Sequence, residues 1–351
     1  MESPADRIRA SARRIGFDAV ALGPLGSGED GRRLLDWLRD GLGADLDYMA
    51  EAPEARADPR VRFPWARGVV AVALHHDPGS TPGTEPARER GPGAFVARYA
   101  RGADYHRVLE GRLKRLRDAV VRAGGPGTRA WWAADHAPVL DRALARDAGL
   151  GFFGKNTMLI RPRAGSYFVL GEVLTSLDLP AAPAPAGSCG TCTRCLEVCP
   201  TRAFPAPFRL DAGRCVSYLT IENRGPIPEE LRPGVGTMVF GCDLCQEVCP
   251  WNRFARPASA RDLRPRALAA DPDLLALAAL DEAGWRRAFS GSAVLRAGWS
   301  GWRRNLAVAL GNSGDAAALP ALRRLASCGD PLVEEHARWG IMRVDSHHAC
   351  Q

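Results

Sequence analysis

The cysteines of this chain are concentrated in one short stretch, and their spacing limits what the chain can fold into. Eight of the ten cysteines lie within residues 189–249. The first four follow the pattern C-x2-C-x2-C-x3-C-P, which is the cysteine run of bacterial ferredoxins. They are Cys189, Cys192, Cys195 and Cys199, and Pro200 follows them. Because three thiolates on so tight a loop can each hold one iron of a cubane, the run predicts a [4Fe–4S] cluster.

A second, shorter run predicts a second cluster. Cys242, Cys245 and Cys249 have the spacing C-x2-C-x3-C-P, and Cys215 lies upstream to supply the missing cysteine. In two-cluster ferredoxins the last cysteine of a run binds the other cluster. We therefore assign one cluster to Cys189, Cys192, Cys195 and Cys249, and the other to Cys199, Cys215, Cys242 and Cys245. Zinc ribbons and buried free thiols are the alternatives, although two runs that end in x3-C-P are not typical of zinc sites.

The N-terminal residues and the composition predict a cytoplasmic protein without a membrane segment. The first 23 residues lack the apolar core of a signal peptide, and no stretch approaches 18 consecutive apolar residues. In the reducing cytoplasm, cysteines favour metal or redox chemistry over disulfides. The net charge of +7 favours an anionic partner, but all but two of the 47 basic residues are arginines. Because this preference for arginine also reflects codon usage, only arginine clusters without nearby acidic residues count as evidence for an anionic partner.

The pattern of apolar residues predicts three domains. Helices over 5–16, 31–41, 104–123 and 138–148 alternate with strands over 17–23, 68–74, 130–134 and 167–175, which predicts an α/β domain over residues 1–178. An exposed loop over 78–93 and a Pro/Ala linker over 179–187 are expected. A ferredoxin-like domain with two [4Fe–4S] clusters follows over 187–256. Residues 257–351 are predicted to be all-α, with helix pairs around GNSGD (311–315) that resemble HEAT-type repeats.

Five further stretches are distinctive, and the last of them includes the second cysteine run: RYARGADYH (98–106), ADHAPVLDRALARDAGLGFFGKNTMLI (134–160), GSYFVLGEVLT (165–175), RCVSYLTIENRGPIPEELRP (214–233) and GCDLCQEVCPWNRFA (241–255). In these stretches the chain resembles the epoxyqueuosine reductases, the cobalamin- and iron–sulfur-dependent enzymes of the last step of queuosine synthesis in tRNA. The resemblance covers nearly the whole chain. It implies a cobalamin-binding α/β domain like that of reductive dehalogenases. It also implies that single electrons pass through the clusters to cobalt, and that the reduced cobalamin acts on the epoxide.

The resemblance also implies a carboxylic acid that protonates the departing oxygen, and we assign this role to Asp135. An acid that gives up a proton near neutral pH must first hold it, and apolar surroundings favour that state. Trp131 and Trp132 precede Asp135 and are expected to provide such surroundings. The alternative is that Asp135 only caps a helix that begins near Pro138.

The residues that match the family's cobalamin contacts are spread along the chain. They are Arg56, Ala97, Asp135, Lys155, Asn156, Leu159, Leu170 and Ser217. The GFFGKN turn offers backbone N–H groups and a lysine, although an ordinary glycine-rich strand entry would have the same sequence. The D-x-H-x-x-G motif of histidine-ligated cobalamin is absent, because Leu109 stands where glycine is required. We therefore expect base-off binding without a histidine from that motif, and a structural role for His106.

The implied substrate is a modified base in the anticodon loop of tRNA, which a protein binds through phosphates and splayed bases. Residues 285–304 contain five arginines and three tryptophans but no acid, and residues 98–117 have a net charge of +5. We assign RNA contacts to Arg286, Arg287, Arg303 and Arg304 and, by family position, to Arg224. A solvated helix face over core tryptophans is the alternative.

Two other functions compete with that of a tRNA-modifying reductase. A dehalogenase of small organic molecules predicts an export signal and no basic helical C-terminus, and this chain has the opposite features. A simple electron carrier would leave the first 180 residues and Asp135 without a role. A low-potential electron donor of unknown identity and a monomeric state complete the expectations.

Overall fold

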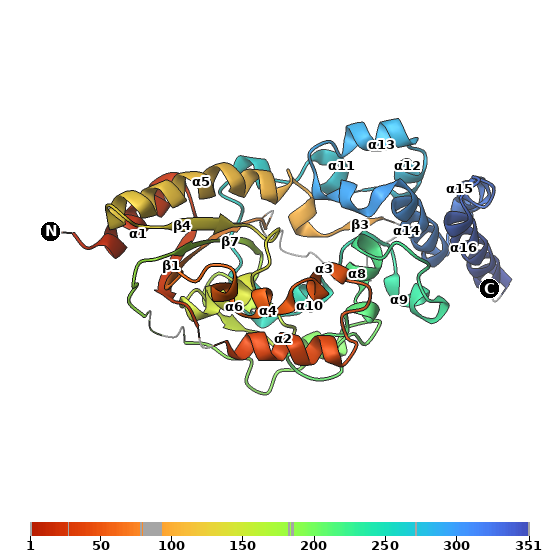
Figure 1. Cartoon of the computed structure of the whole chain (residues 1–351). Helices are drawn as coiled ribbons and strands as arrows, with labels where there is room; N and C mark the ends of the chain where they lie inside the picture. The colour runs from red at the N-terminus through yellow and green to blue at the C-terminus, as the bar shows by residue number, and fades with distance from the viewer. Residues whose placement is uncertain are drawn as a thin grey trace.

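The computed structural model describes residues 2–26, 28–77, 79, 93–181, 183, 186–270 and 272–349. Its N-terminal part contains a four-stranded sheet in the order β1-β2-β7-β4 (Figure 1). The strands are β1 (Ala19–Pro24), β2 (Gly68–His75), β7 (Phe168–Thr175) and β4 (Ala130–Ala133). All four lie where the sequence predicts strands, and β2 is buried along its whole length. Every neighbouring pair is antiparallel, whereas alternating helices and strands more often form a parallel sheet.

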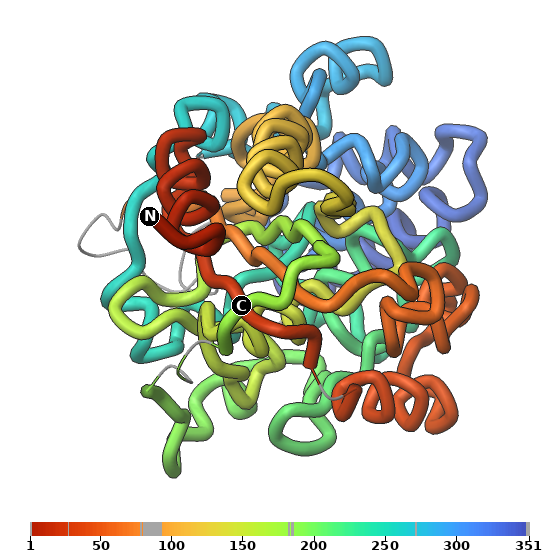
Figure 2. Tube along the Cα trace, turned by 60° about the vertical axis from the view of Figure 1, so that its left-hand side comes forward, coloured from red at the N-terminus to blue at the C-terminus, as the bar shows by residue number. Residues whose placement is uncertain are grey.

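Helices cover both faces of this sheet. Figure 2 shows α1 (Pro4–Ile15) beside α5 (Tyr105–Gly124), and both pack on the face that includes Val70 and Val72. The opposite face, which includes Ala71 and Ala73, is covered by α6 (Asp141–Asp147). A further helix, α2 (Glu29–Arg39), confirms the prediction over 31–41. Helix α5 begins after Asp104, whose carboxylate accepts a hydrogen bond from the backbone N–H of His106.

The helix predicted over 138–148 begins later than expected. Residues 134–139 form a series of bends, and α6 starts only at Asp141, with Leu140 as its N-cap residue. Asp135 has φ of 63°, in the left-handed region that non-glycine residues seldom adopt. Asp135 therefore does not cap α6, and the capping alternative is wrong.

Short elements connect the sheet to the cysteine-rich segment. They are α3 (Asp47–Ala50), α4 (Pro53–Ala57), β3 (Phe95–Val96), β5 (Phe152–Phe153) and β6 (Leu159–Ile160). The GFFGKN stretch (151–156) contains β5 and begins the turn to β6, and the two strands pair with each other. The predicted loop over 78–93 and the linker over 179–187 lie partly outside the described residues, which omit 78, 80–92, 182, 184 and 185.

The cysteine-rich segment has two similar turns of helix, one after the start of each cysteine run. These are α7 (Arg194–Glu197) and α10 (Leu244–Glu247), and they contact each other. Between them lie α8 (Val216–Ile221), α9 (Arg232–Val235) and β8 (Met238–Phe240). Strand β8 pairs in parallel with β3 of the N-terminal part, so the two parts share a small sheet.

The C-terminal part is all-α in the residues that the structure describes (Figure 1). Its helices are α11 (Ala267–Ala270), α12 (Leu274–Ala278), α13 (Glu282–Ala288), α14 (Gly298–Ser313), α15 (Leu319–Leu325) and α16 (Pro331–Ala349). They share one hydrophobic core with Val96, Ile221 and Phe240. The domain limits at 178, 187 and 257 and the HEAT classification stay predictions. Among the described helices, none has the length and hydropathy that a membrane span requires.

Candidate active site and iron–sulfur centres

The eight cysteines lie in two neighbouring groups. Cys195 interacts electrostatically with Cys189, Cys192 and Cys249. Cys215 interacts with Cys199, and Cys242 with Cys215 and Cys245. An interaction between Cys195 and Cys245 joins the two groups. This grouping supports the cluster assignment made from the sequence.

The chemistry of these thiols fits iron–sulfur clusters. Burial raises the pKa of Cys195 and of Cys215 to about 11, and it also raises the pKa of Cys249. Because iron binds the thiolate, its binding must displace protons from these side chains and is therefore coupled to folding. Across the described ranges, no three His, Cys, Asp or Glu side chains are placed to hold one ion. A cubane instead takes one thiolate on each of four irons.

Replacing Cys215 by serine is expected to halve the iron content, from about eight to about four atoms per chain. Cys215 lies outside both runs, and the second cluster is complete only with its thiolate. Iron analysis after anaerobic reconstitution measures the loss. Cys328→Ser is the matched control, because Cys328 is a free, half-buried thiol outside both groups. Full iron content in Cys215→Ser would show that another residue completes the second cluster.

Asp135 lies in the bends after β4, and its side chain is 62% exposed. The hydroxyl group of Tyr105 donates a hydrogen bond to Asp135 Oδ2, and His106 Nε2 lies 3.9 Å from the same oxygen. We expected apolar side chains to enclose this carboxyl group, and that prediction is wrong. Trp131 packs on Phe63, and Trp132 makes an edge contact with His136. The tryptophans are therefore engaged with other rings.

Phenol groups and an ion pair lie around Asp135. Burial, with a smaller contribution from the Asp135 charge, raises the pKa of Tyr48, Tyr99 and Tyr105. These hydroxyl groups therefore stay protonated at neutral pH and can act as hydrogen-bond donors. Arg296, which precedes α14, forms an ion pair with Glu222 after α8. Its pKa is raised by Glu222 and, to a smaller extent, by Asp135, so the α/β part, the cysteine-rich segment and the C-terminal part meet here.

His106, which lies 3.9 Å from Asp135, also borders an open hollow of about 290 Å³. The hollow is lined by His106, Glu110, Trp132 and His136. His106 forms a hydrogen bond with Asp104, whose carboxylate oxygen lies 2.7 Å from His106 Nδ1. This hydrogen bond gives His106 a partner within the protein, and its structural role stays a prediction.

Lys155 and Asn156 bind the cysteine loops. Lys155 Nζ donates hydrogen bonds to the carbonyl groups of Gly190 (2.9 Å) and Cys192 (3.0 Å). Asn156 Nδ2 donates to the carbonyl group of Cys245 at 3.1 Å. The GFFGKN turn therefore fastens both cysteine runs to the α/β part. The two side chains are engaged by protein carbonyl groups.

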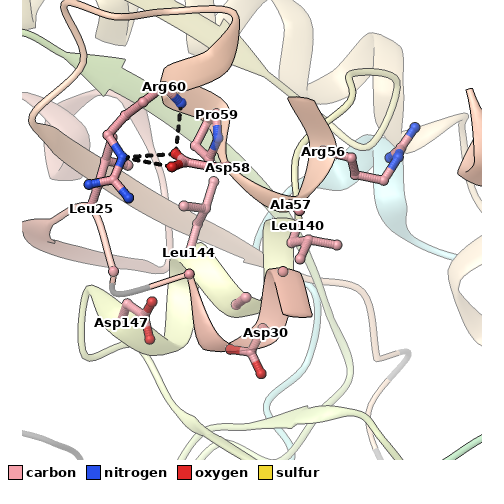
Figure 3. Close-up of a pocket in the computed structure, with 14 residues that line it drawn as sticks. Leu25, Asp30, Arg56, Ala57, Asp58, Pro59, Arg60, Leu140, Leu144 and Asp147 are labelled. Atoms are coloured by element: carbon pink, nitrogen blue, oxygen red, sulfur yellow. Dashed lines mark hydrogen bonds and ion pairs between the residues drawn. The ribbon is translucent and has the colours of Figure 1, made fainter. Parts of the chain in front are cut away.

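Arg56 lies at the edge of a small pocket of about 30 Å³ (Figure 3). Its guanidinium group points away from this pocket and donates to the carbonyl groups of Tyr48 (3.1 Å) and Ala137 (3.4 Å). Arg56 Nε is buried without a hydrogen-bond partner. Because Ala137 belongs to the bends that include Asp135, Arg56 supports the same loop.

The four remaining residues assigned to cobalamin lie in two places. Leu159 and Leu170 belong to the hydrophobic layer beneath α6, where Leu159 is buried and Leu170 half-buried. Ala97 is buried beside the cysteine-rich segment, and its backbone N–H donates to Phe240. Ser217 Oγ lies 3.4 Å from the carbonyl oxygen of Cys242.

The arginines to which we assigned RNA contacts lie in different environments, and the structure contradicts some of these assignments. Arg304 is 1% exposed and donates to the carbonyl groups of Leu219, Asn223 and Gly225. Its guanidinium group is enclosed by protein and cannot reach RNA. Arg224 likewise donates to three backbone carbonyl groups, and Arg303 pairs with Asp330 at 2.9 Å.

Two of the assigned arginines are exposed. Arg286 and Arg287 both lie on the outer face of α13. Trp285 and Trp302, by contrast, are buried in the C-terminal core. The alternative of core tryptophans is therefore correct for these two residues, while the exposed arginines remain candidates for RNA binding.

Sequence reasoning missed the partners of Asp135. Tyr105 stands next to His106 in the stretch RYARGADYH. That stretch was recognised, but the hydrogen bond from Tyr105 to Asp135 was not predicted. Tyr48, Glu222 and Arg296 come from three distant segments and have no shared spacing. Only the folded chain brings them together.

Comparison with known proteins agrees with this architecture. Residues 188–252 match the family described as "4Fe-4S double cluster binding domain", and residues 56–135 match "Epoxyqueuosine reductase QueG, DUF1730". The fold and the two cysteine groups thus define an iron–sulfur oxidoreductase. The epoxyqueuosine reductase of Pseudomonas aeruginosa is 43% identical over 344 residues, which span 97% of this chain and 94% of the relative. This chain belongs to the epoxyqueuosine reductase family.

Solved structures of the family have the same fold. An epoxyqueuosine reductase in complex with an epoxyqueuosine-modified tRNA stem loop superposes with a TM-score of 0.86 at 31% identity. The Bacillus subtilis enzyme, in a structure whose catalytic aspartate loop is swung out of the active site, gives a TM-score of 0.85 at 31% identity. Each match covers 97% of this chain and 90% of the other.

Proposed function

We propose that this chain reduces epoxyqueuosine in tRNA to queuosine, with Asp135 as a proton donor to the departing oxygen. The observation that supports this most directly is the position of Asp135, whose exposed carboxyl group accepts a hydrogen bond from Tyr105 and lies 3.9 Å from His106, a residue that lines an open hollow. Its relatives are named for this reaction, and one of them was solved with the modified tRNA stem loop. The dehalogenase and electron-carrier alternatives have no comparable support.

The residues around Asp135 suit a proton transfer. Removal of the epoxide oxygen as water consumes two electrons and two protons, of which Asp135 would supply one. Tyr105 donates its hydrogen bond to Oδ2, which leaves Oδ1 as the oxygen that holds the transferable proton. Because burial raises the pKa of Tyr105, this phenol stays a donor throughout the physiological range. Tyr105 thereby fixes the orientation of the acid.

Cobalamin is part of this proposal, and several of the assigned residues fit it. When bound, cobalamin and the two clusters supply one-electron chemistry at the epoxide. Ala97 and Ser217 on the cluster side, with Leu170 and Asp135 on the sheet side, would form its surroundings. Asn156 would contribute backbone groups, since its side chain already binds a cysteine loop. The side chain and both backbone groups of Lys155 already form hydrogen bonds within the protein. The unpartnered Arg56 Nε is a further donor for a corrin amide.

The full chain, reconstituted anaerobically with iron, sulfide and cobalamin, tests this proposal. Incubated with epoxyqueuosine-containing tRNA and a low-potential reductant, it is expected to form queuosine. Omission of iron or of cobalamin is expected to abolish the product. Product formation without cobalamin, or turnover restricted to small organohalides, would refute the proposal. The natural electron donor and the monomeric state stay predictions.

Replacing Arg286 and Arg287 together by alanine is expected to weaken tRNA binding. The slope of log K against log salt falls by about one for each phosphate that the protein no longer neutralises. Binding measured over a range of salt concentrations shows the change. The matched control is Arg323→Ala with Arg324→Ala, an exposed arginine pair on α15. Equal slopes for both double variants would place the RNA contacts elsewhere.

A further inference from the structure

Two carboxyl groups face each other beneath the bends that hold Asp135, and the mechanism above uses neither. Glu172, in the middle of β7, is fully buried, and Asp141 is the first residue of α6. Both Oε atoms of Glu172 and Oδ1 of Asp141 are buried and have no hydrogen-bond donor among the residues that the structure describes. The two side chains are nevertheless close enough to form a hydrogen bond with each other. Two carboxyl groups can do so only when one of them holds a proton.

The sheet provides the space for this carboxyl pair, Asp141 and Glu172. Glu172 is in register with Ala71 of β2 and with Ala133 of β4, and Ala71 is in register with Ala21 of β1. This row therefore presents three methyl groups and one carboxyl group to α6. Alanine at each neighbouring position leaves room for two carboxyl side chains between sheet and helix. The same row places them in an apolar layer.

The charges around the pair are negative. Glu172 experiences the charges of Asp141 and Asp135, and its alanine neighbours in the sheet have none. The two arginines of α6 are engaged elsewhere. Arg142 donates to the carbonyl group of Thr157, and Arg146 pairs with Asp30 and Asp147. In such surroundings two ionised carboxylates are strongly disfavoured.

The surroundings of the pair favour protonation of Glu172. Burial, and then the charge of Asp141, hold the pKa of Glu172 well above its usual range. Burial also raises the pKa of Asp141, but the carboxyl group of Glu172 and two backbone N–H groups oppose this shift. These directions favour Glu172 as the hydrogen-bond donor and Asp141 as the acceptor.

One of those two backbone N–H groups belongs to Asp135. The contact matters because Asp135 is in the left-handed region, where a non-glycine residue persists only if its surroundings hold it there. We propose that Asp141 and Glu172 share one proton and act as a positioning pair, which holds the Asp135 bend in the conformation that presents its carboxyl group. The inference rests on the proposed role of Asp135, but the shared proton does not.

Infrared spectroscopy of the iron-loaded full chain at neutral pH tests the shared proton. The wild-type protein is expected to show the C=O stretch of one buried protonated carboxyl group, and Glu172→Gln is expected to lack it. Because the raised pKa favours the neutral form, the band should persist at neutral pH and disappear as the pH rises through that pKa. Asp118→Asn, a change at an exposed carboxylate, should retain it. A spectrum without this band in the wild-type protein would overturn the proposal.

Two variants of Asp141 test the positioning role. Asp141→Ala removes the acceptor for the Asp135 N–H, so we expect kcat to fall at least about tenfold while KM and iron content stay unchanged. Hydrogen exchange at the Asp135 amide should become faster. Asp141→Asn keeps an acceptor oxygen and should restore most of both properties. Wild-type kcat and unchanged amide exchange in Asp141→Ala would overturn the positioning role.

These readouts separate this inference from the proposed function. If Asp135→Asn proved fully active, the proton-donor role would fail, while the infrared band and amide exchange would still report on the pair. Glu172→Gln can donate its amide to Asp141 and is expected to remain active at neutral pH. A loss of kcat in Glu172→Gln as large as that in Asp141→Ala would show that the amide cannot replace the protonated carboxyl group, and would contradict the proposed hydrogen bond.

Discussion

Asp135→Asn is expected to lower turnover on epoxyqueuosine-containing tRNA by about 10²- to 10⁴-fold, the range for loss of a general acid. The amide has nearly the same shape and can still accept the hydrogen bond from Tyr105, but it has no acidic proton to give. Binding should therefore survive while the chemical step fails. Single-turnover kinetics, together with tRNA affinity and iron content, measure the two effects separately.

A matched substitution controls for the change of charge. Asp118→Asn removes one exposed carboxylate from α5, the same helix that provides Tyr105. Its turnover should equal that of the wild-type enzyme. Equal turnover in Asp135→Asn and Asp118→Asn would remove Asp135 from the mechanism and leave its left-handed backbone without a functional reason.

Arg304→Ala is expected to destabilise the protein by roughly 3 to 5 kcal/mol, because each buried acceptor left unpaired costs about 1 to 3 kcal/mol and the cavity adds to this loss. The guanidinium group is enclosed at the junction of α14 and α8, and it satisfies the carbonyl groups of Leu219, Asn223 and Gly225. Burial, with the nearby charge of Arg224, lowers its pKa to about 10, so it remains a cation at neutral pH. Alanine would leave a cavity and three unpaired carbonyl groups.

Denaturant unfolding of the full chain, followed by circular dichroism, measures this loss. Arg338→Ala is the matched control, because Arg338 is 62% exposed and pairs only with Glu334 one turn away in α16. A change of about 0.5 kcal/mol or less is expected there. Similar midpoints for the two variants would mean that Arg304 does not support the junction.

Sequence patterns predicted those strands and helices that depend mainly on neighbouring residues. The unbroken apolar run of β2 and the helical spacing in α5 each define an element within a few neighbouring residues, and both are confirmed. The cysteine spacing in the same way predicted a double-cluster domain, which the family match over residues 188–252 supports. In these cases the physical reason lies within one segment of sequence.

The environment of Asp135 and the burial of Arg304 could not be predicted in that way. Asp135 lies in bends after β4, while its hydroxyl partner comes from α5 and its backbone acceptor from α6. Arg304 stands in an arginine- and tryptophan-rich helix whose sequence is typical of a binding face, yet it fills the junction with α8. Both outcomes depend on which segments meet in three dimensions, which residue spacing does not encode.

The pairing of β3 with β8 has a consequence for how the holoenzyme matures. Cys242 follows β8 almost directly, and the only partner of β8 in the described sheets is a strand from the far N-terminal side of the chain. The second iron centre is thus assembled on a scaffold that exists only after remote segments have met. Because metal binding is coupled to folding, we expect insertion of the second cluster to depend on the pairing of these remote segments.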